Sequence, residues 1–476
     1  MSNHDSRRWW ALFVLCLGSL MIVLDATIVN VALPSIKSSL GFSDSGLAWV
    51  VNAYLLTFGG FLLLGGRLGD LFGHRKLFIG GISLFTFASL LCGIAGSEVF
   101  LIAARALQGF GGAAASAVGL SLMMNLFTEP HERAKAMGYL GFVSSGGGSI
   151  GVLLGGVLTG SFDWHWIFLV NLPVGIAVVA LAFIFLPKHK PLADSHHIDV
   201  AGAVTVTASL MLAVYGIVGG NEAGWTSPKT IGFIAAAVVL FAIFIMIENK
   251  VKSPLMPLSL FRFRNVVIAN IAAVLWAAAM FAWFFLSALY LQLVLHMTPL
   301  QIGLSFLPAN LIMAAFSLGL SAKLVGMFGL KKPLIVGLTF AAVGLAYLAH
   351  APVDGHFLID ILPAMVLLGI GAGIAFNPLL LAAMNDVPPD ESGLASGIVN
   401  TAFMMGGALG LAVLASIAAA RTMSLAHQGA SQAVALTGGY HAAFIVGGVC
   451  ALVAGGLGFF LRTSKSYGDH SQSMAH

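Results

Sequence analysis

Long uninterrupted apolar segments are the feature of this sequence that most restricts its fold. A helix of about 20 apolar residues crosses the roughly 30 Å hydrocarbon layer of a bilayer. The apolar residues are continuous rather than alternating, which favours spanning helices over the strands of a membrane barrel. We therefore predict an all-α integral membrane protein. Its fourteen expected spans lie near residues 9–33, 47–65, 77–96, 99–125, 134–160, 165–187, 200–219, 229–247, 266–294, 302–322, 333–350, 358–382, 392–420 and 438–461.

The composition supports the same class and excludes others. Of the 476 residues, 59% are hydrophobic and 8% are charged, whereas a soluble domain carries about 25% charged residues. No soluble domain is expected between the spans, so any transport must draw its energy from a gradient rather than from a hydrolysis domain in this chain. The sequence also offers no nucleophile triad, paired carboxylates or metal cluster near a membrane interface. We expect no cofactor, no metal site and no enzymatic activity.

The positions of lysine and arginine predict an orientation. The net charge is +4, which we interpret as a consequence of topology rather than as a sign of a nucleic-acid partner. With the N-terminus in the cytoplasm, eighteen of the 22 basic residues lie on the cytoplasmic side; the other four are Lys37, Lys229, Arg421 and Arg105. By the positive-inside rule, this asymmetry places both termini in the cytoplasm and requires an even number of spans.

A basic, glycine-rich turn occurs twice in the chain. The segment GGRLGDLFGHRK, residues 65–76, aligns with SAKLVGMFGLKK, residues 321–332, and a second pair of segments aligns at residues 132–151 and 391–410. We infer two homologous six-helix halves, residues 1–190 and residues 266–476, the second ending in a short cytoplasmic tail. Residues 191–265 then form an inserted pair of transmembrane helices with cytoplasmic linkers. Secondary transporters use duplicated bundles of this kind to open alternately to each side.

Two charged side chains are expected deep inside spans, Asp25 in the first and Arg105 in the fourth. A charge at the bilayer centre costs about 2.5–3.5 kcal/mol on insertion scales, so such a residue is a functional candidate by default. Asp25 is our candidate for a proton or cation site, and the alternative is a carboxylate fixed in a structural hydrogen-bond network. A permanent contact with Arg105 would keep Asp25 ionised. A proton antiporter therefore needs that contact to be absent, water-mediated or dependent on the conformational state.

The turn at residues 65–76 is our candidate for a gate, with Arg67, Asp70, Gly73 and Arg75 as its residues. The glycines permit a tight reversal of the chain. Asp70 is placed to contact a helix N-terminus or an arginine of a neighbouring span, as a latch that breaks when the bundle opens. The alternative is a solvated basic loop. Gly326 replaces Asp70 in the second copy, so a latch of this kind would be one-sided.

Aromatic and polar residues inside the spans are candidates for a substrate cavity. Trp276, Trp283 and Tyr290 recur at intervals of seven in the ninth predicted span. Such a stripe suits a lipophilic or cationic guest, but it could equally pack against other helices or face lipid. The remaining candidates are single polar side chains, each weak evidence by itself: Asn30, Asn52, Tyr54, Gln108, Gln292, Asn377 and Asn400.

These residues resemble those of the major facilitator superfamily, specifically its fourteen-span drug:proton antiporter branch, over essentially the whole chain. GGRLGDLFGHRK resembles the signature between the second and third spans. LDATIVNVALP, residues 24–34, resembles the first-span motif of the branch and places its acidic residue at Asp25. IAARALQGFGGAA, from residue 102, resembles the fourth-span motif, whose arginine, here Arg105, is associated with proton coupling. WHWIFLVNLPVG, from residue 164, resembles the sixth-span entry, with His165 where an arginine is usual.

Two motifs depart from the pattern of that branch. GGSIGVLLGG, residues 147–156, resembles the fifth-span antiporter motif except that Val152 stands at the position of its proline. Its glycines, which would allow close helix packing, are Gly147, Gly151, Gly155 and Gly156. NTAFMMGGALG, from Asn400, has apolar residues at 403–405 where the branch often has polar ones, which would suit a lipophilic substrate if those residues face the cavity.

The resemblance implies a multi-pass exporter of the cytoplasmic membrane that takes up protons in exchange for lipophilic drugs, cationic ones included. The expected partners are a small lipophilic substrate, protons and the lipid bilayer, and the expected state is a monomer. Export of a lipid, siderophore or endogenous metabolite, or electroneutral uptake, is the alternative on the same fold. A channel or a membrane-embedded enzyme fits the sequence less well.

Overall fold

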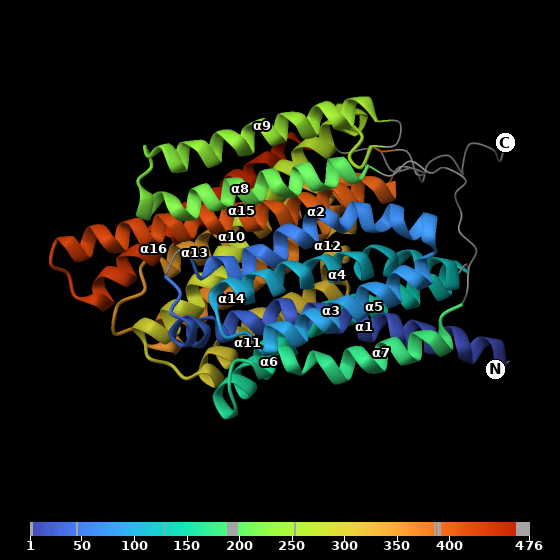
Figure 1. The fold of residues 1–476 in the computed structure, drawn as a ribbon, viewed down its shortest axis with the longest axis horizontal. Helices are drawn as coiled ribbons and strands as arrows, with labels where there is room; N and C mark the ends of the chain where they lie inside the picture. The colour runs from blue at the N-terminus through green and yellow to red at the C-terminus, as the bar shows by residue number, and fades with distance from the viewer. Residues whose placement is uncertain are drawn as a thin grey trace.

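The computed structural model describes residues 3–43, 46–127, 129–187, 199–251, 254–384, 387 and 392–462. Every regular element in these ranges is a helix, as hydrocarbon requires of a chain that must satisfy its backbone hydrogen bonds internally. The helices run along the long axis of the molecule in Figure 1, and the start of α1 lies at the same end as the end of α16. We call this the termini end and the opposite one the far end.

The first half contains the helices α1 (Asn3–Leu40), α2 (Ala48–Phe72), α3 (His74–Gly93), α4 (Glu98–Leu126), α5 (Pro130–Ser161), α6 (Trp166–Leu169) and α7 (Asn171–Phe185). The inserted pair is α8 (Val200–Ala223) and α9 (Pro228–Lys250). The second half contains η1 (Leu258–Arg262), α10 (Arg264–Leu289), η2 (Tyr290–Val294), α11 (Pro299–Ala315), η3 (Phe316–Leu320), α12 (Ser321–Phe328), α13 (Lys331–Leu348), η4 (Phe357–Ile361), α14 (Leu362–Met384), α15 (Ser392–His427), α16 (Gln432–Leu457) and η5 (Gly458–Phe460).

Twelve helices of the described chain are long and apolar enough to cross a membrane. Two more apolar helical stretches, Ile150–Ser161 in α5 and Pro299–Ala315 in α11, are shorter than the others. The run from residue 302 to 322 is interrupted at Gly319, whose φ of +130° is not helical. The all-α membrane fold is confirmed, whereas the count of fourteen spans stays a prediction.

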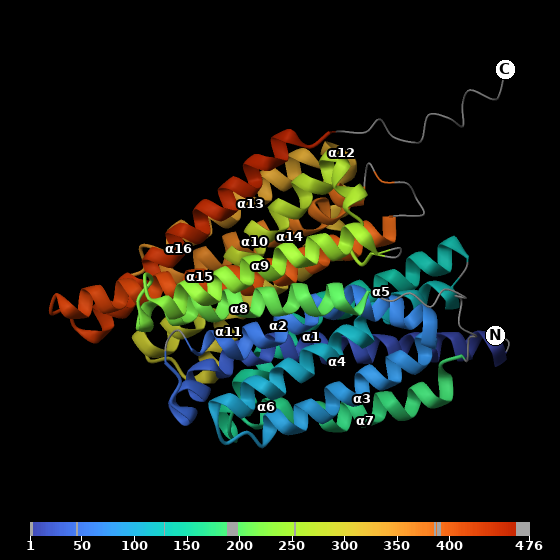
Figure 2. The same ribbon diagram turned by 45° about the horizontal axis from the view of Figure 1, so that its top comes forward.

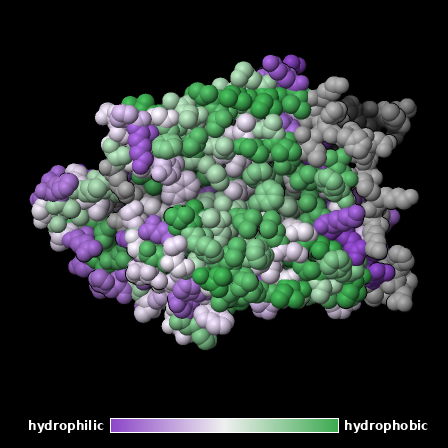
Figure 3. Space-filling model, viewed as in Figure 1, coloured by the Kyte–Doolittle hydropathy of each residue, from purple (hydrophilic) through white to green (hydrophobic). Residues whose placement is uncertain are grey.

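The surface of the molecule has the polarity of a membrane protein. Figure 3 shows a broad hydrophobic band between two ends where the hydrophilic residues gather. Many large apolar side chains are exposed at the surface, such as Ile176 at 65% and Val238 at 64%. A soluble monomer rarely exposes so large a contiguous apolar surface.

Figure 2 shows α3, α6 and α7 of the first half at one side of the molecule and α12, α13 and α16 of the second half at the other, with α8 and α9 between them. α8 contacts α2 of the first half and α15 of the second, whereas α9 packs mainly on α8. The inserted pair therefore touches both halves through one of its two helices.

Glycines bring helix backbones into contact at matching places in the two halves. A Cβ at Gly111 of α4 would meet the backbone of α3 at Phe85, and one at Gly371 of α14 would meet the backbone of α13 at Ala341, each 2.6 Å away. Small residues are needed at such crossings because lipid gives helices no hydrophobic drive to associate, and close packing must hold them together.

A second backbone contact joins the two halves at the far end. Gly156, near the end of α5, faces Pro299 and Leu300 at the start of α11, and Gly303 of α11 faces the carbonyl oxygen of Val152. A Cβ at Gly156 would lie 2.8 Å from the Pro299 oxygen, and a Cβ at Gly303 would lie 2.8 Å from the Val152 oxygen. At the far end of the molecule, the end of α5 and the start of α11 are thus in direct main-chain contact.

Replacing Gly156 by valine is expected to separate α5 from α11, because the new side chain has no space. Overpacking of this kind costs about 1–3 kcal/mol, which would lower the thermal stability of the purified protein in detergent. Gly160→Val on the same helix is the matched control, since nothing lies within 4 Å of a Cβ there. Equal melting temperatures for the two variants would contradict the contact.

Candidate functional site

The two charges predicted deep inside spans are in direct contact. Nη1 of Arg105 on α4 lies 2.6 Å from Oδ2 of Asp25 on α1. Asp25 is fully buried and Arg105 is 1% exposed. The pair lies within the first half, where an uncompensated charge would be costly for either partner.

The Asp25 carboxylate has two further donors. Nε2 of Gln108 donates to Oδ1 at 2.6 Å, and Nδ2 of Asn171, the first residue of α7, donates to the same oxygen at 3.0 Å. Both amides also donate to the hydroxyl of Ser89 on α3. Four helices (α1, α3, α4 and α7) therefore contribute to one buried network.

The Arg105 guanidinium is held by groups besides the carboxylate. Its Nε donates to the backbone oxygen of Val50 at 3.0 Å, and Nη1 also donates to Oε1 of Gln108 at 2.6 Å. The guanidinium lies over the ring of Tyr54, 4.4 Å from the ring centroid. Since Val50 and Tyr54 belong to α2, Arg105 connects the buried acid to that helix.

Sequence reasoning found Asp25, Arg105 and Gln108 but did not find Asn171 or Ser89. Each of these two is a single polar residue in an apolar stretch, and only helix packing shows that their side chains meet. The polarity of Asn171 in the segment VNLPVG was the available signal.

The described residues of the second half form no such network at the corresponding helix crossing. Gly109 and Gly111 of α4 correspond to Gly369 and Gly371 of α14, in LQGFGG and LLGIGA. Both pairs of glycines pack against neighbouring backbones, those of α2 and α3 in one half and of α11 and α13 in the other. In this alignment, Arg105 and Gln108 meet the buried apolar residues Met365 and Leu368.

The basic turn is a helix–glycine–helix reversal in both halves. Gly73 between α2 and α3 has φ +94°, and Gly329 after α12 has φ +72°, a region that side chains rarely adopt. Arg75 donates to the backbone oxygen of Phe183 at 2.6 Å, at the end of α7, and Arg67 is exposed. The side chain of Asp70 lies outside the described part of the structure, so its latch role stays a prediction.

The antiporter-motif glycines face two partners. A Cβ at Gly151 or Gly155 would collide with α1 and one at Gly147 would lie tightly against its side chains, whereas Gly156 faces α11. α5 therefore joins the helix that carries Asp25 to the opposite half. Val152 is buried at this crossing, with 1% of its surface exposed.

A cleft of about 470 Å³ lies between the halves. Its walls are the parts of α2, α4 and α15 nearest the termini end, together with Leu255 before α10. Arg67 and Asn400 are the predicted site residues that line it, beside the hydroxyls of Ser116, Ser121 and Ser396. The halves thus meet at the far end and leave space between them at the termini end.

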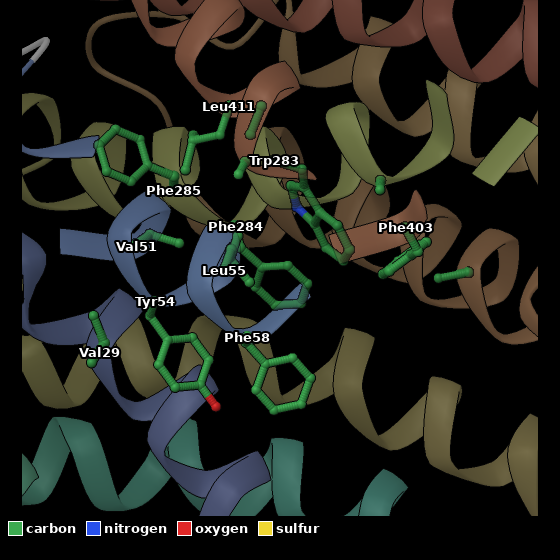
Figure 4. Packing of buried hydrophobic residues seen from close by; sticks show 14 of the residues in the cluster. Val29, Val51, Tyr54, Leu55, Phe58, Trp283, Phe284, Phe285, Phe403 and Leu411 are labelled. Atoms are coloured by element: carbon green, nitrogen blue, oxygen red, sulfur yellow. The ribbon is translucent and has the colours of Figure 1, made fainter. Parts of the chain in front are cut away.

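The aromatic stripe lies in the packed core in this conformation. Trp276 and Trp283 are fully buried and Tyr290 is 2% exposed, with its hydroxyl bonded to the Pro352 oxygen. Figure 4 shows Trp283 of α10 near Phe284 of the same helix and Phe403 of α15, in a cluster that also includes side chains of α2.

The remaining cavity candidates differ in their surroundings. Asn52 is fully buried with neither side-chain atom hydrogen-bonded, and Oε1 of Gln292 has no partner. Asn30 donates to the Ala26 oxygen, and Asn377 is half-buried. Their roles stay predictions. Within the described ranges no group of His, Cys, Asp and Glu could hold a metal ion.

Comparison with known proteins agrees with this architecture. Residues 15–411 match the family described as Major Facilitator Superfamily. The puromycin resistance protein pur8 of Streptomyces alboniger is 38% identical over 440 residues, which cover 92% of this chain and 87% of that protein. The cephamycin export protein CmcT of Amycolatopsis lactamdurans is 37% identical, over 88% of this chain and 87% of its own. A partially occluded inward-open structure of the xylose transporter XylE from E. coli has a similar fold, with a TM-score of 0.63 and 14% identity, over 96% of this chain and 100% of that one.

The chain therefore belongs to the Major Facilitator Superfamily. It is a multi-pass membrane transporter and not an enzyme.

Removing either partner of the buried ion pair is expected to destabilise the protein strongly. Asp25→Asn and Arg105→Gln should each lower the free energy of unfolding by about 3–5 kcal/mol, since each removes one partner of a desolvated pair. The double variant should lose much less than the sum, measured by denaturant titration in mixed micelles.

The half-exposed pair formed by Arg8 and Glu132, 3.2 Å apart, is the control for this cycle. Its coupling should be about 0–1 kcal/mol. Additive losses at Asp25 and Arg105 would show that the two side chains do not interact.

Proposed function

We propose that this protein exports lipophilic drug-like compounds across the cytoplasmic membrane in exchange for protons, by alternating access. Relatives named for puromycin resistance and cephamycin export support the class of cargo. The positive-inside pattern supports cytoplasmic termini, so the cleft at the termini end would face the cytoplasm. Cargo would then enter the cleft from the inside of the cell.

The observation that carries proton coupling is the buried contact between Asp25 and Arg105. In this conformation a cation and two amides complement the carboxylate charge, so a proton can bind only where Arg105 moves away. Arg105 keeps partners when it does, because the Val50 oxygen, Gln108 and the Tyr54 ring also hold it. Proton binding by this route therefore requires that the contact between Asp25 and Arg105 break in another state of the transport cycle.

Arg105 also provides a physical connection from the acid to the cleft. It binds the backbone and an aromatic ring of α2, and the later part of α2 forms one wall of the cleft through Leu62, Leu63 and Arg67. Protonation of Asp25 would free Arg105 to move with α2 and α4, while the α5–α11 contact opens at the far end. One chain builds the whole cleft, so we propose that the monomer is the transporting unit.

Export of a lipid, siderophore or metabolite is the second candidate, on the same fold and cleft. An apolar cavity of about 390 Å³ lies between the inserted pair and α10 and α15, and most of its lining side chains are hydrophobic. This cavity favours a lipophilic cargo in either case. A panel of dyes, puromycin and native lipids in the same transport assay separates the two candidates.

Asp25→Asn is expected to abolish efflux driven by a pH gradient, because asparagine cannot bind and release the proton. The purified protein in liposomes would be given an imposed pH gradient, and a lipophilic cationic dye would be followed together with internal pH. Dye movement should dissipate the gradient in the wild type and fall to the level of empty liposomes in the variant.

Asp354→Asn, at an exposed aspartate, is the matched control and should behave as the wild type. Exchange of labelled for unlabelled dye without a gradient should persist in Asp25→Asn, which shows that the variant is folded. Retained pH-driven transport in Asp25→Asn would remove this residue from the mechanism. Dye-insensitive internal pH in the wild type would overturn the proposed exchange.

A further inference from the structure

Two buried carboxyl groups of the inserted pair lie outside the network of Asp25. Asp199 is the residue before α8, and Glu248 lies in the last turn of α9. Both therefore lie where the α8–α9 hairpin begins and ends, at the termini end. Asp199 is 3% exposed and Glu248 is 4% exposed. We call them the carboxyl pair.

Each carboxyl group uses one oxygen to accept a backbone hydrogen bond. Oδ1 of Asp199 accepts from the Gly202 nitrogen at 2.7 Å, which caps α8, and Oε2 of Glu248 accepts from the Met256 nitrogen at 3.0 Å. The other two oxygens, Oδ2 and Oε1, are buried without a donor. The bare Cα of Gly202 faces both of these oxygens, so the unpaired Oδ2 of Asp199 and the unpaired Oε1 of Glu248 lie close together.

Basic groups do not neutralise the pair in the described part of the chain. The elements packed around it carry Arg67 on α2, Lys250 on α9 and Arg262 on η1, and all three side chains are exposed. Among the described residues, none of these three side chains forms a hydrogen bond or an ion pair with either carboxyl group. The charged residues of α15, Arg421 and His427, lie near its other end.

Two carboxylates in contact and out of water cannot both be ionised, so such pairs hold one proton. The helix dipoles at the two positions determine which carboxyl group holds the proton. Asp199 lies at the N-terminus of α8, where backbone N–H groups favour a negative charge, whereas Glu248 lies at the C-terminal end of α9, where a negative charge is disfavoured.

We propose that Glu248 and Asp199 share one proton and form a second proton-binding site, separate from Asp25. Oε1–H of Glu248 donates to Oδ2 of Asp199, while Oε2 of Glu248 accepts from Met256. A single proton thereby gives a partner to both unpaired oxygens. The site binds a proton by the formation of one O–H bond on Glu248, and its loss leaves two facing carboxylates. It does not depend on the proposed exchange at Asp25.

The hydrogen bond between Glu248 and Met256 links the carboxyl pair to residues that line two cavities. Met256 lines the apolar cavity between the inserted pair and α10 and α15. The adjacent Leu255 lines both that cavity and the cleft between the halves. When the proton leaves, repulsion between the carboxylates pushes Glu248 away from Asp199. Residues 254–257, held by the Glu248–Met256 bond, then lose their fixed position. Protonation of the carboxyl pair therefore controls the position of a segment that borders both cavities.

Infrared difference spectroscopy tests the shared proton directly. The full chain in lipid nanodiscs at neutral pH should show a carboxylic-acid C=O band that is absent in Glu248→Gln. Glutamine keeps the geometry, because its amide donates to Asp199 and its oxygen accepts from Met256. Glu129→Gln, at an exposed glutamate, should keep the band. An unchanged band in Glu248→Gln would overturn the proposal.

Thiol labelling tests the consequence for the linker. In a background with Cys16, Cys92 and Cys450 replaced by alanine, Leu255→Cys would be labelled with a water-soluble maleimide between pH 6 and pH 9. Rates are divided by those of Ser259→Cys, an exposed position, to cancel the pH dependence of the thiol.

The normalised rate at position 255 should rise by about tenfold with pH, a change of about 1.4 kcal/mol in the exposure equilibrium. In Glu248→Gln, it should stay low throughout. A rise that persists in Glu248→Gln, or no rise in the parent, would contradict the proposed control of the linker. Neither test measures transport, so failure here is distinct from failure of proton-coupled export.

Discussion

Close contact between helix backbones is the constraint on which the rest of this structure depends. Lipid tails are as apolar as leucine, so helices gain stability from packing rather than from leaving water. Gly111 and Gly371 provide that packing within the halves, and Gly156 and Gly303 provide it between them. The first kind of contact holds the helices of each half together, and the second closes the space between the halves at the far end. The position of the cleft follows from both.

The comparison of the halves separates the role of the buried charges from that of the fold. Arg105 and Gln108 stand where Met365 and Leu368 stand in the second half, beside glycines that make equivalent helix contacts. The same helix crossing is therefore built with apolar side chains in one half and with an ion pair in the other. Since apolar replacement of a buried ion pair often costs no stability, the charges in the first half indicate a function other than holding the helices together.

Much of this arrangement could be predicted from the sequence, and the misses share a cause. Asp25 and Arg105 could be predicted as site residues because a charged side chain inside an apolar run needs a compensating partner, and few are available there. Asn171 and Ser89 were not, because one amide or hydroxyl in such a run can meet many neighbours, and only the packing of α3 and α7 selects one. The break at Gly319 gave no signal, since glycine is common inside membrane helices. Asp199 and Glu248 are distant in the sequence and become neighbours only because α8 and α9 form an antiparallel hairpin.

The packing of α9 has a consequence for handling the protein. This helix rests mainly on α8 and exposes Val238, Val239 and Phe241 at its surface, so lipid is its solvent on most sides. Extraction into a short-chain detergent replaces that solvent with a thinner and more mobile apolar layer. The α8–α9 hairpin is therefore the part of the molecule whose packing depends most on the choice of amphiphile, and a bilayer mimetic preserves it better than a small micelle.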